Sequence, residues 1–253
     1  DCYPSPLVDK VVTTSGVVTH KIFADHESHA KTFFLQQNGI GEWSGIYVHD
    51  YNISPNVGDE LILSGTVNEY GGGTQLTDIL DHTIESSGNS PSEFLVSSLA
   101  ALGGYDCNLS AESYESMLIK VNNVTVADVN EEFGYWIISD NSGESAQVDD
   151  HLLDVAGGGL PDPPLGEFSI TGILNSYFDY KISPRFMGDI TENEIDPYCG
   201  DGACNGDETV EGCPEDCDEC GADGSSCSNV TFSVDMSIEG VIGDIKLRTS
   251  TIN

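Results

Sequence analysis

The residues best equipped for chemistry lie in segment 196–227, which holds ten acidic residues, no basic residue and six of the eight cysteines. Carboxylate and amide oxygens crowded on glycine turns suit Ca²⁺, which prefers hard oxygen ligands. A metal-free disulfide knot explains the segment equally well, and its acids do not fall at the positions of an EF-hand. The candidate calcium ligands are Asp201, Asn205, Asp207, Glu208 and Asp216.

Transition metals are a weaker alternative at two places. In segment 196–227 the surrounding acids raise the thiol pKa and disfavour the thiolates that zinc needs. His26 and His29, flanked by Asp25 and Glu27, could ligate a metal, but a solvated polar loop explains them better.

The cysteines predict disulfides in an extracellular protein. The chain opens with Asp1-Cys2-Tyr3-Pro4 and has neither a basic start nor an apolar leader, which predicts a processed, mature N-terminus. Clustered cysteines behind such a start favour cross-links over metal ligation. The expected disulfide residues are Cys2, Cys107, Cys199, Cys204, Cys213, Cys217, Cys220 and Cys227, and eight cysteines leave the pairing open.

The net charge of the chain limits the classes of partner that it is expected to bind. The chain carries 43 Asp and Glu against 8 Lys and Arg, a formal net charge of −35. This balance argues against a basic surface for nucleic acid or anionic lipid, and it also keeps a secreted protein soluble. No apolar run approaches the roughly 20 residues that cross a bilayer, so we expect no membrane insertion.

Two successive sets of short runs rich in β-forming residues make up most of the chain and are expected to position its functional side chains. The first set covers residues 11–23, 32–36, 45–49, 60–70 and 74–79, and most of its runs are bounded by Gly, Pro, Asn or Asp. The second covers 117–126, 134–139, 146–148, 168–175 and 180–190. Between the sets, Phe94, Leu95, Leu99 and Leu102 have helical spacing, and Gly103-Gly104 would end a short connecting helix over 92–102. The expected fold is therefore all-β, with two tandem barrels.

The C-terminal segment alternates apolar and polar residues, the pattern of a half-buried strand. Its apolar positions include Phe232, Val234, Met236 and Ile238. Such a strand must pair with a sheet: with the barrels, with a domain beyond this segment, or with the sheet edge of a neighbouring subunit. The last alternative predicts self-association into a filament. The expected division is 1–90, first barrel; 91–195, connecting helix and second barrel; 196–227, Cys-rich knot; and 228–253, strand segment.

Several short stretches resemble the OB-fold module found ahead of the catalytic domain in secreted bacterial nucleases and related surface proteins. They are SGIYV at 44–48, VGDEL at 57–61, SGTVNEY at 64–70 and TQL at 74–76, with weaker counterparts YESMLIKV at 114–121 and ITGIL at 170–174. The stretches CGDGACNGDE at 199–208 and CPEDC at 213–217 resemble short Cys-rich repeats of secreted multidomain proteins. In an OB barrel, Gly65 would let a bent strand pass close to its neighbour.

The resemblance implies a ligand face on the second and third strands of each barrel, with the loops joining strands one to two and four to five. Aromatic rings there would stack bases and cations would meet phosphates of single-stranded nucleic acid, although aromatic residues on short strands are more often core. The implied residues are Lys21, Lys31, Phe34, Trp43, Tyr47, Tyr70, Trp136, Lys181 and Arg185.

No catalytic constellation stands out, so the sequence predicts a non-enzymatic extracellular protein. We expect a structural and binding unit of an extracellular assembly, with single-stranded nucleic acid as a candidate ligand. Two alternatives remain: a substrate-positioning fragment of a secreted nuclease, and a calcium-dependent adhesive or carbohydrate-binding module.

Overall fold

The computed structural model describes residues 4–22, 31–39, 41–102, 108–130, 132–153, 159–176 and 179–193. The chain separates into two compact units, Asp1–Asn193 and Glu194–Asn253, and all the elements below belong to the first. Among the described residues, no helix is both long enough and apolar enough to cross a membrane.

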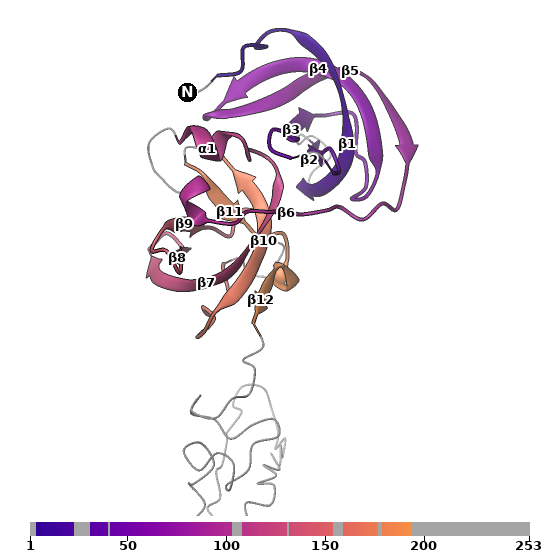
Figure 1. Cartoon of the computed structure of the whole chain (residues 1–253). Coiled ribbons are helices and arrows are strands. Elements are labelled where there is room, and N and C mark those ends of the chain that lie inside the picture. The colour runs from indigo at the N-terminus through magenta and orange to yellow at the C-terminus, as the bar shows by residue number, and fades with distance from the viewer. Residues whose placement is uncertain are drawn as a thin grey trace, which may run out of the picture. The chain divides into compact units, whose positions relative to one another are not determined.

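The first barrel consists of five strands in the closed order β1-β2-β3-β5-β4 (Figure 1). The long β1 pairs with β2 on one side and closes the barrel against β4 on the other, whereas β3 and β5 run parallel. The strands are β1 (Val11–Ile22), β2 (Lys31–Gln36), β3 (Gly45–Asp50), β4 (Glu60–Tyr70) and β5 (Gly73–Ser86). The sequence predicted all five, but it ended the last at residue 79 because the continuation to Ser86 is largely polar and exposed.

The second barrel repeats this topology. Its strands close through the pairs β7–β8, β8–β9, β9–β11, β11–β10 and β10–β7, and again the third and fifth strands are parallel. They are β7 (Leu118–Asn130), β8 (Tyr135–Asp140), β9 (Ser145–Val148), β10 (Phe168–Asn175) and β11 (Lys181–Ser183). A 3-10 turn (Met187–Asp189) and the short β12 (Ile190–Glu192) follow, so the predicted run 180–190 is divided. The all-β tandem-barrel prediction is confirmed.

The predicted connecting helix over 92–102 is wrong. Phe94 and Leu95 form β6 (Phe94–Leu95), which pairs in parallel with Ile119 and Lys120 of β7. Strand β8 pairs with β7 only from Val124 onward, so the edge beside residues 119–120 is open to β6. Only Leu99–Ala101 is helical, as one 3-10 turn. So short an apolar segment gains more from a strand partner than from an isolated helix, which is costly to nucleate.

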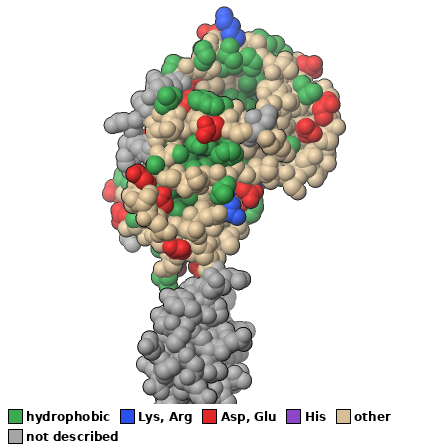
Figure 2. All heavy atoms as spheres, in the orientation of Figure 1, with side chains coloured by type: hydrophobic (Ala, Val, Ile, Leu, Met, Phe, Trp, Pro, Cys, Tyr) green, Lys and Arg blue, Asp and Glu red, His purple; other side chains and the backbone are tan. Residues whose placement is uncertain are grey.

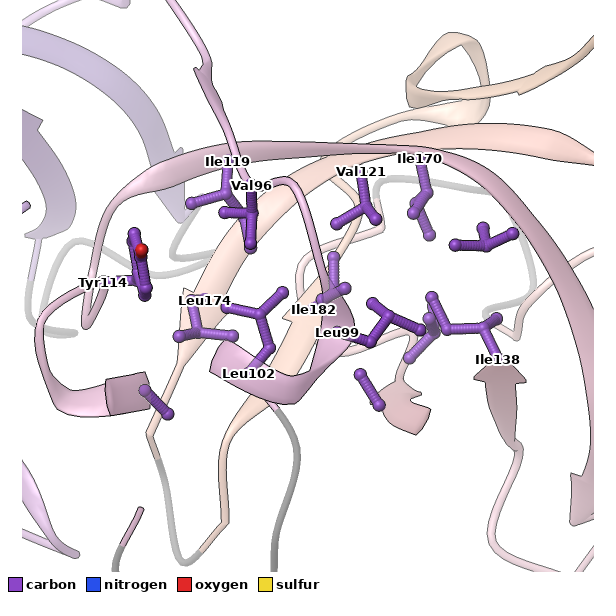
Figure 3. Packing of buried hydrophobic residues seen from close by; sticks show 14 of the residues in the cluster. Val96, Leu99, Leu102, Tyr114, Ile119, Val121, Ile138, Ile170, Leu174 and Ile182 are labelled. Atoms are coloured by element: carbon purple, nitrogen blue, oxygen red, sulfur yellow. The ribbon is translucent and has the colours of Figure 1, made fainter. Parts of the chain in front are cut away.

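Each barrel has its own apolar core. In the second, buried side chains from β7, β10 and the segment after β6 point toward one another, as Figure 3 shows for Val96, Ile119 and Leu174. In the first, the core includes Phe33, Leu61 and Leu76. The predicted close approach at Gly65 is present, because a Cβ there would lie 2.6 Å from the Ile79 Cδ1 atom.

Candidate functional site at the junction of the barrels

A third apolar cluster joins the barrels. Phe34 from β2 packs with Leu118 of β7, Ile173 of β10 and Leu152, and Tyr47 of β3 packs against them. Phe34 is only 4% exposed. The predicted ligand face of the first barrel is therefore partly covered by the second barrel, whose docking shapes what remains open.

Backbone contacts bring the barrels closer still. A Cβ at Gly45 would lie 2.6 Å from the Met117 nitrogen and 2.6 Å from the Ser116 carbonyl carbon. The amide of Trp43 donates to the Ser113 carbonyl at 2.6 Å. Only glycine at the start of β3 permits this approach.

A cavity of about 700 Å³ lies beside these contacts. Its volume is within the range of small-molecule sites. Its lining comes from β1 to β5 of the first barrel and, in the second, from the segment before β7, the β9–β10 connection and the end of β10. The residues are Ile22, Phe34, Tyr47, His49, Asn68, Tyr70, Gly73, Thr74, Gln75, Thr77, Glu115, Ser116, His151, Asn175 and Ser176.

Aromatic rings form a row along one wall. The Phe34 and Tyr47 ring centroids are 5.0 Å apart, and Tyr47 is followed by His49 at 6.4 Å. Burial raises the pKa of Tyr47, so its hydroxyl stays protonated and can donate a hydrogen bond. Tyr70, at the end of β4, is 66% exposed and offers a ring at the cavity rim. Rings and hydroxyls together can hold a ligand that has both an apolar face and polar edges.

Amides supply polar groups to the same cavity. Gln75 donates from Nε2 to the Asn68 Oδ1 atom at 3.2 Å, across the β4–β5 pair. Asn175, at the end of β10, adds a third carboxamide from the second barrel. Carboxamides both donate and accept hydrogen bonds, and therefore suit uncharged polar groups.

Glu115 lies between this cavity and a smaller one of about 330 Å³, lining both. Its Oε1 atom accepts from the Thr74 amide at 2.8 Å and from the Ser176 hydroxyl at 2.6 Å, so it joins the start of β5 to the second barrel. Burial, together with the charges of Glu112 and Glu69, raises the pKa of Glu115 to about 8, although the two hydrogen bonds lower it. At neutral pH this carboxyl group is mostly protonated.

Glu112 is the neighbouring carboxyl group, at the end of α1 (Leu109–Glu112). Burial raises its pKa, the hydrogen bond from the Tyr180 hydroxyl lowers it, and the charge of Glu69 raises it. Among the described residues, no three His, Cys, Asp or Glu side chains gather closely enough to hold a metal ion.

Three of the four predicted cations have partners elsewhere. Arg185 makes two hydrogen bonds of 2.8 Å to the Asp189 carboxylate, and its Nη1 atom donates to the Thr19 carbonyl at 3.1 Å. Lys21 donates to the Pro55 carbonyl, and Lys181 lies 3.9 Å from Asp149. Lys31, at the start of β2, is half-buried. No Lys or Arg is among the described residues that line the cavity, and Figure 2 shows basic side chains to be sparse on the visible face.

The predicted aromatic residues divide into three groups. Tyr47 and Tyr70 line the cavity together with Phe34. Trp43 is exposed and lines the smaller cavity. Trp136 is 2% exposed and packs edge-on against Phe168 in the second core, so its burial argues against base stacking there.

The remaining predicted sites lie outside the described residues. They comprise the metal candidates (Asp201, Asn205, Asp207, Glu208, Asp216, and His26 with His29), the eight cysteines (Cys2, Cys107, Cys199, Cys204, Cys213, Cys217, Cys220, Cys227) and the assembly strand (Phe232, Val234, Met236, Ile238).

The sequence did not predict that the second barrel contributes residues to the cavity lining. Glu115, Asn175, Ser176 and His151 come from three separate segments. No local pattern marks them, because they reach the first barrel's ligand face only through the docking of the barrels. No protein-family model matches the chain, and no curated protein is significantly similar to it.

Proposed function

We propose that the chain is a non-enzymatic extracellular binding protein that holds a saccharide without negative charge in the cavity between its two barrels. The observation that carries the proposal is the combination of the Tyr47 and Tyr70 rings with three carboxamides, and no Lys or Arg, among the described residues of the lining. Sugar rings present an apolar face to aromatic side chains and hydroxyl edges to amides.

The same lining argues for a saccharide over single-stranded nucleic acid. OB-type barrels bind both ligand classes through this face. A nucleic acid, however, brings one negative charge per phosphate, which must be neutralised. The chain carries a formal net charge of −35, and Arg185 and Lys21 already hold partners. The extracellular setting is supported by the acidic, cysteine-rich composition.

Binding of oligosaccharides that carry no negative charge, measured on a glycan array and then by calorimetry, tests the proposal. We expect Tyr70→Ala to lower affinity by about tenfold, since it removes a ring from the cavity rim. Tyr51→Ala is the matched control, because Tyr51 is 59% exposed on the same barrel but does not line the cavity.

A single-stranded oligodeoxythymidine is titrated in parallel at two salt concentrations. Salt-dependent binding of this oligonucleotide, weakened by Tyr70→Ala and accompanied by a blank glycan array, would overturn the saccharide proposal. Equal losses of affinity in Tyr70→Ala and Tyr51→Ala would show that the saccharide does not bind in the cavity.

A further inference from the structure

The cavity wall contains an acidic group in surroundings that lack positive charge. Glu115 lines both cavities, and no Lys or Arg lines either one within the described part of the chain. A buried carboxylate without a cationic partner is costly, and proteins avoid the cost by keeping the group protonated.

The geometry of Glu115 leaves one oxygen for a ligand. Both of its hydrogen bonds, from the Thr74 amide and the Ser176 hydroxyl, go to Oε1. In the described residues, Oε2 accepts no hydrogen bond. The carboxyl group is thus held from both barrels through Oε1, and the described residues leave its other oxygen without a hydrogen-bond partner.

The groups around Glu115 favour a positive charge there. Glu112 on α1 and Glu69 on β4 both raise its pKa, which stands at about 8, so neither carboxyl group offsets the negative charge that Glu115 carries when it ionises. The Tyr180 hydroxyl faces Glu112, and the other titratable groups of the cavity are Tyr47, Tyr70, His49 and His151. The two tyrosine rings add attraction for a cation placed over their faces.

Building on the proposed function, we propose that the cavity selects an amino sugar, whose free amine takes the carboxyl proton of Glu115 as it binds and then, as an ammonium group, pairs with Oε2. The ammonium group supplies the missing positive charge, while the ring lies against Tyr47 and Tyr70. Glu115 is then the residue that determines specificity, and the aromatic and amide groups determine that a sugar binds at all.

Two oligosaccharides that differ only at the nitrogen test this inference. The full chain is titrated by calorimetry with a β-1,4-linked glucosamine tetramer and with its N-acetylated counterpart, which lacks the charge. We expect the wild type to bind the glucosamine tetramer about tenfold more tightly, the effect of one charge-assisted hydrogen bond. This comparison needs no variant and therefore does not depend on the folding of one.

Substitution then assigns the preference to one side chain. Glu115→Gln keeps an acceptor for Thr74 and Ser176 but cannot carry charge, so we expect the two tetramers to bind it within about twofold of each other. Glu144→Gln, which removes one charge from the exposed β8–β9 turn, should keep the full preference. Circular dichroism verifies the fold of both variants.

Each outcome has a distinct meaning. Equal binding of the two tetramers by the wild type overturns the amino-sugar inference and leaves the proposed function standing. An unchanged preference in Glu115→Gln overturns the role of Glu115. A chain that binds neither these tetramers nor any glycan of the array contradicts the proposed function as well.

Discussion

The backbone amide of Leu118, the first residue of β7, donates to the Oε1 atom of Gln36 in β2 at 2.6 Å. Gln36 is a buried polar residue of the first barrel, and its side chain supplies the acceptor that the second barrel's leading strand lacks at this point. A side-chain amide therefore completes the hydrogen bonding between two sheets.

Gln36→Leu should destabilise the protein by about 1–3 kcal/mol, because it leaves the buried Leu118 amide without an acceptor. Urea unfolding measures the loss, and hydrogen exchange should show weaker protection of the Leu118 amide. Gln37→Leu changes the neighbouring, less buried glutamine and should stay within about 0.5 kcal/mol of the wild type. Unchanged protection in Gln36→Leu would count against the bond.

Gly45→Ala should cost about 1–3 kcal/mol, since its Cβ would press on the backbone of Ser116 and Met117, which cannot rotate away as a side chain can. The same substitution should also weaken ligand binding, because these residues adjoin the cavity. Gly166→Ala is the control: nothing lies within 4 Å of its Cβ position. Equal stability of the two variants would show that the barrels do not approach this closely.

Glu115 should make stability fall as pH rises. Its folded pKa of about 8 exceeds the ordinary value of 4.5, so between these values the unfolded chain loses a proton that the folded chain retains. The free energy of unfolding then falls by at most about 1.4 kcal/mol per pH unit from this group, with no further change above pH 8. Urea unfolding from pH 5 to 9 should show a shallower decline in Glu115→Gln. Parallel curves for wild type and variant would contradict the assignment.

A chelator distinguishes a saccharide site in the cavity from a calcium-dependent site in the acidic Cys-rich segment. We expect saccharide binding to be the same in calcium and in EDTA, because the described part of the cavity lining offers no group of metal ligands. Calorimetry in both buffers checks this. Loss of binding in EDTA would instead favour the calcium-dependent adhesive alternative and Asp201, Asp207 and Asp216 as ligands.

Trp136→Ala should destabilise the protein by about 3–5 kcal/mol, the cost of emptying a large side-chain position in a core. Trp136→Phe keeps an aromatic ring against Phe168 and should cost less. If Trp136 instead stacked bases, the substitution would lower affinity for the oligodeoxythymidine while leaving the unfolding midpoint in place.

The sequence predicted nearly all the strands because their information is local. Runs such as 60–70 combine β-branched residues with turn residues at their ends, and both preferences act within a few residues. The helix predicted at Phe94 and Leu95 was wrong, because pairing with the free edge of β7 stabilises these two residues more than an isolated helix would. The sequence also placed Trp136 and Arg185 on a ligand face, although one lies in the core and the other is held by Asp189.

Composition and pattern alone determined an acidic all-β chain with two successive five-strand sets, and the resemblance to OB-fold modules pointed to Tyr47 and Tyr70 as ligand residues. Only the tertiary structure brought Glu115 and Ser176 to Thr74, at the start of β5. Residues so far apart in the sequence share no local pattern. Their meeting depends on how Phe34 and Gln36 dock against Leu118, and that docking arises from packing and hydrogen bonds between two separately formed barrels.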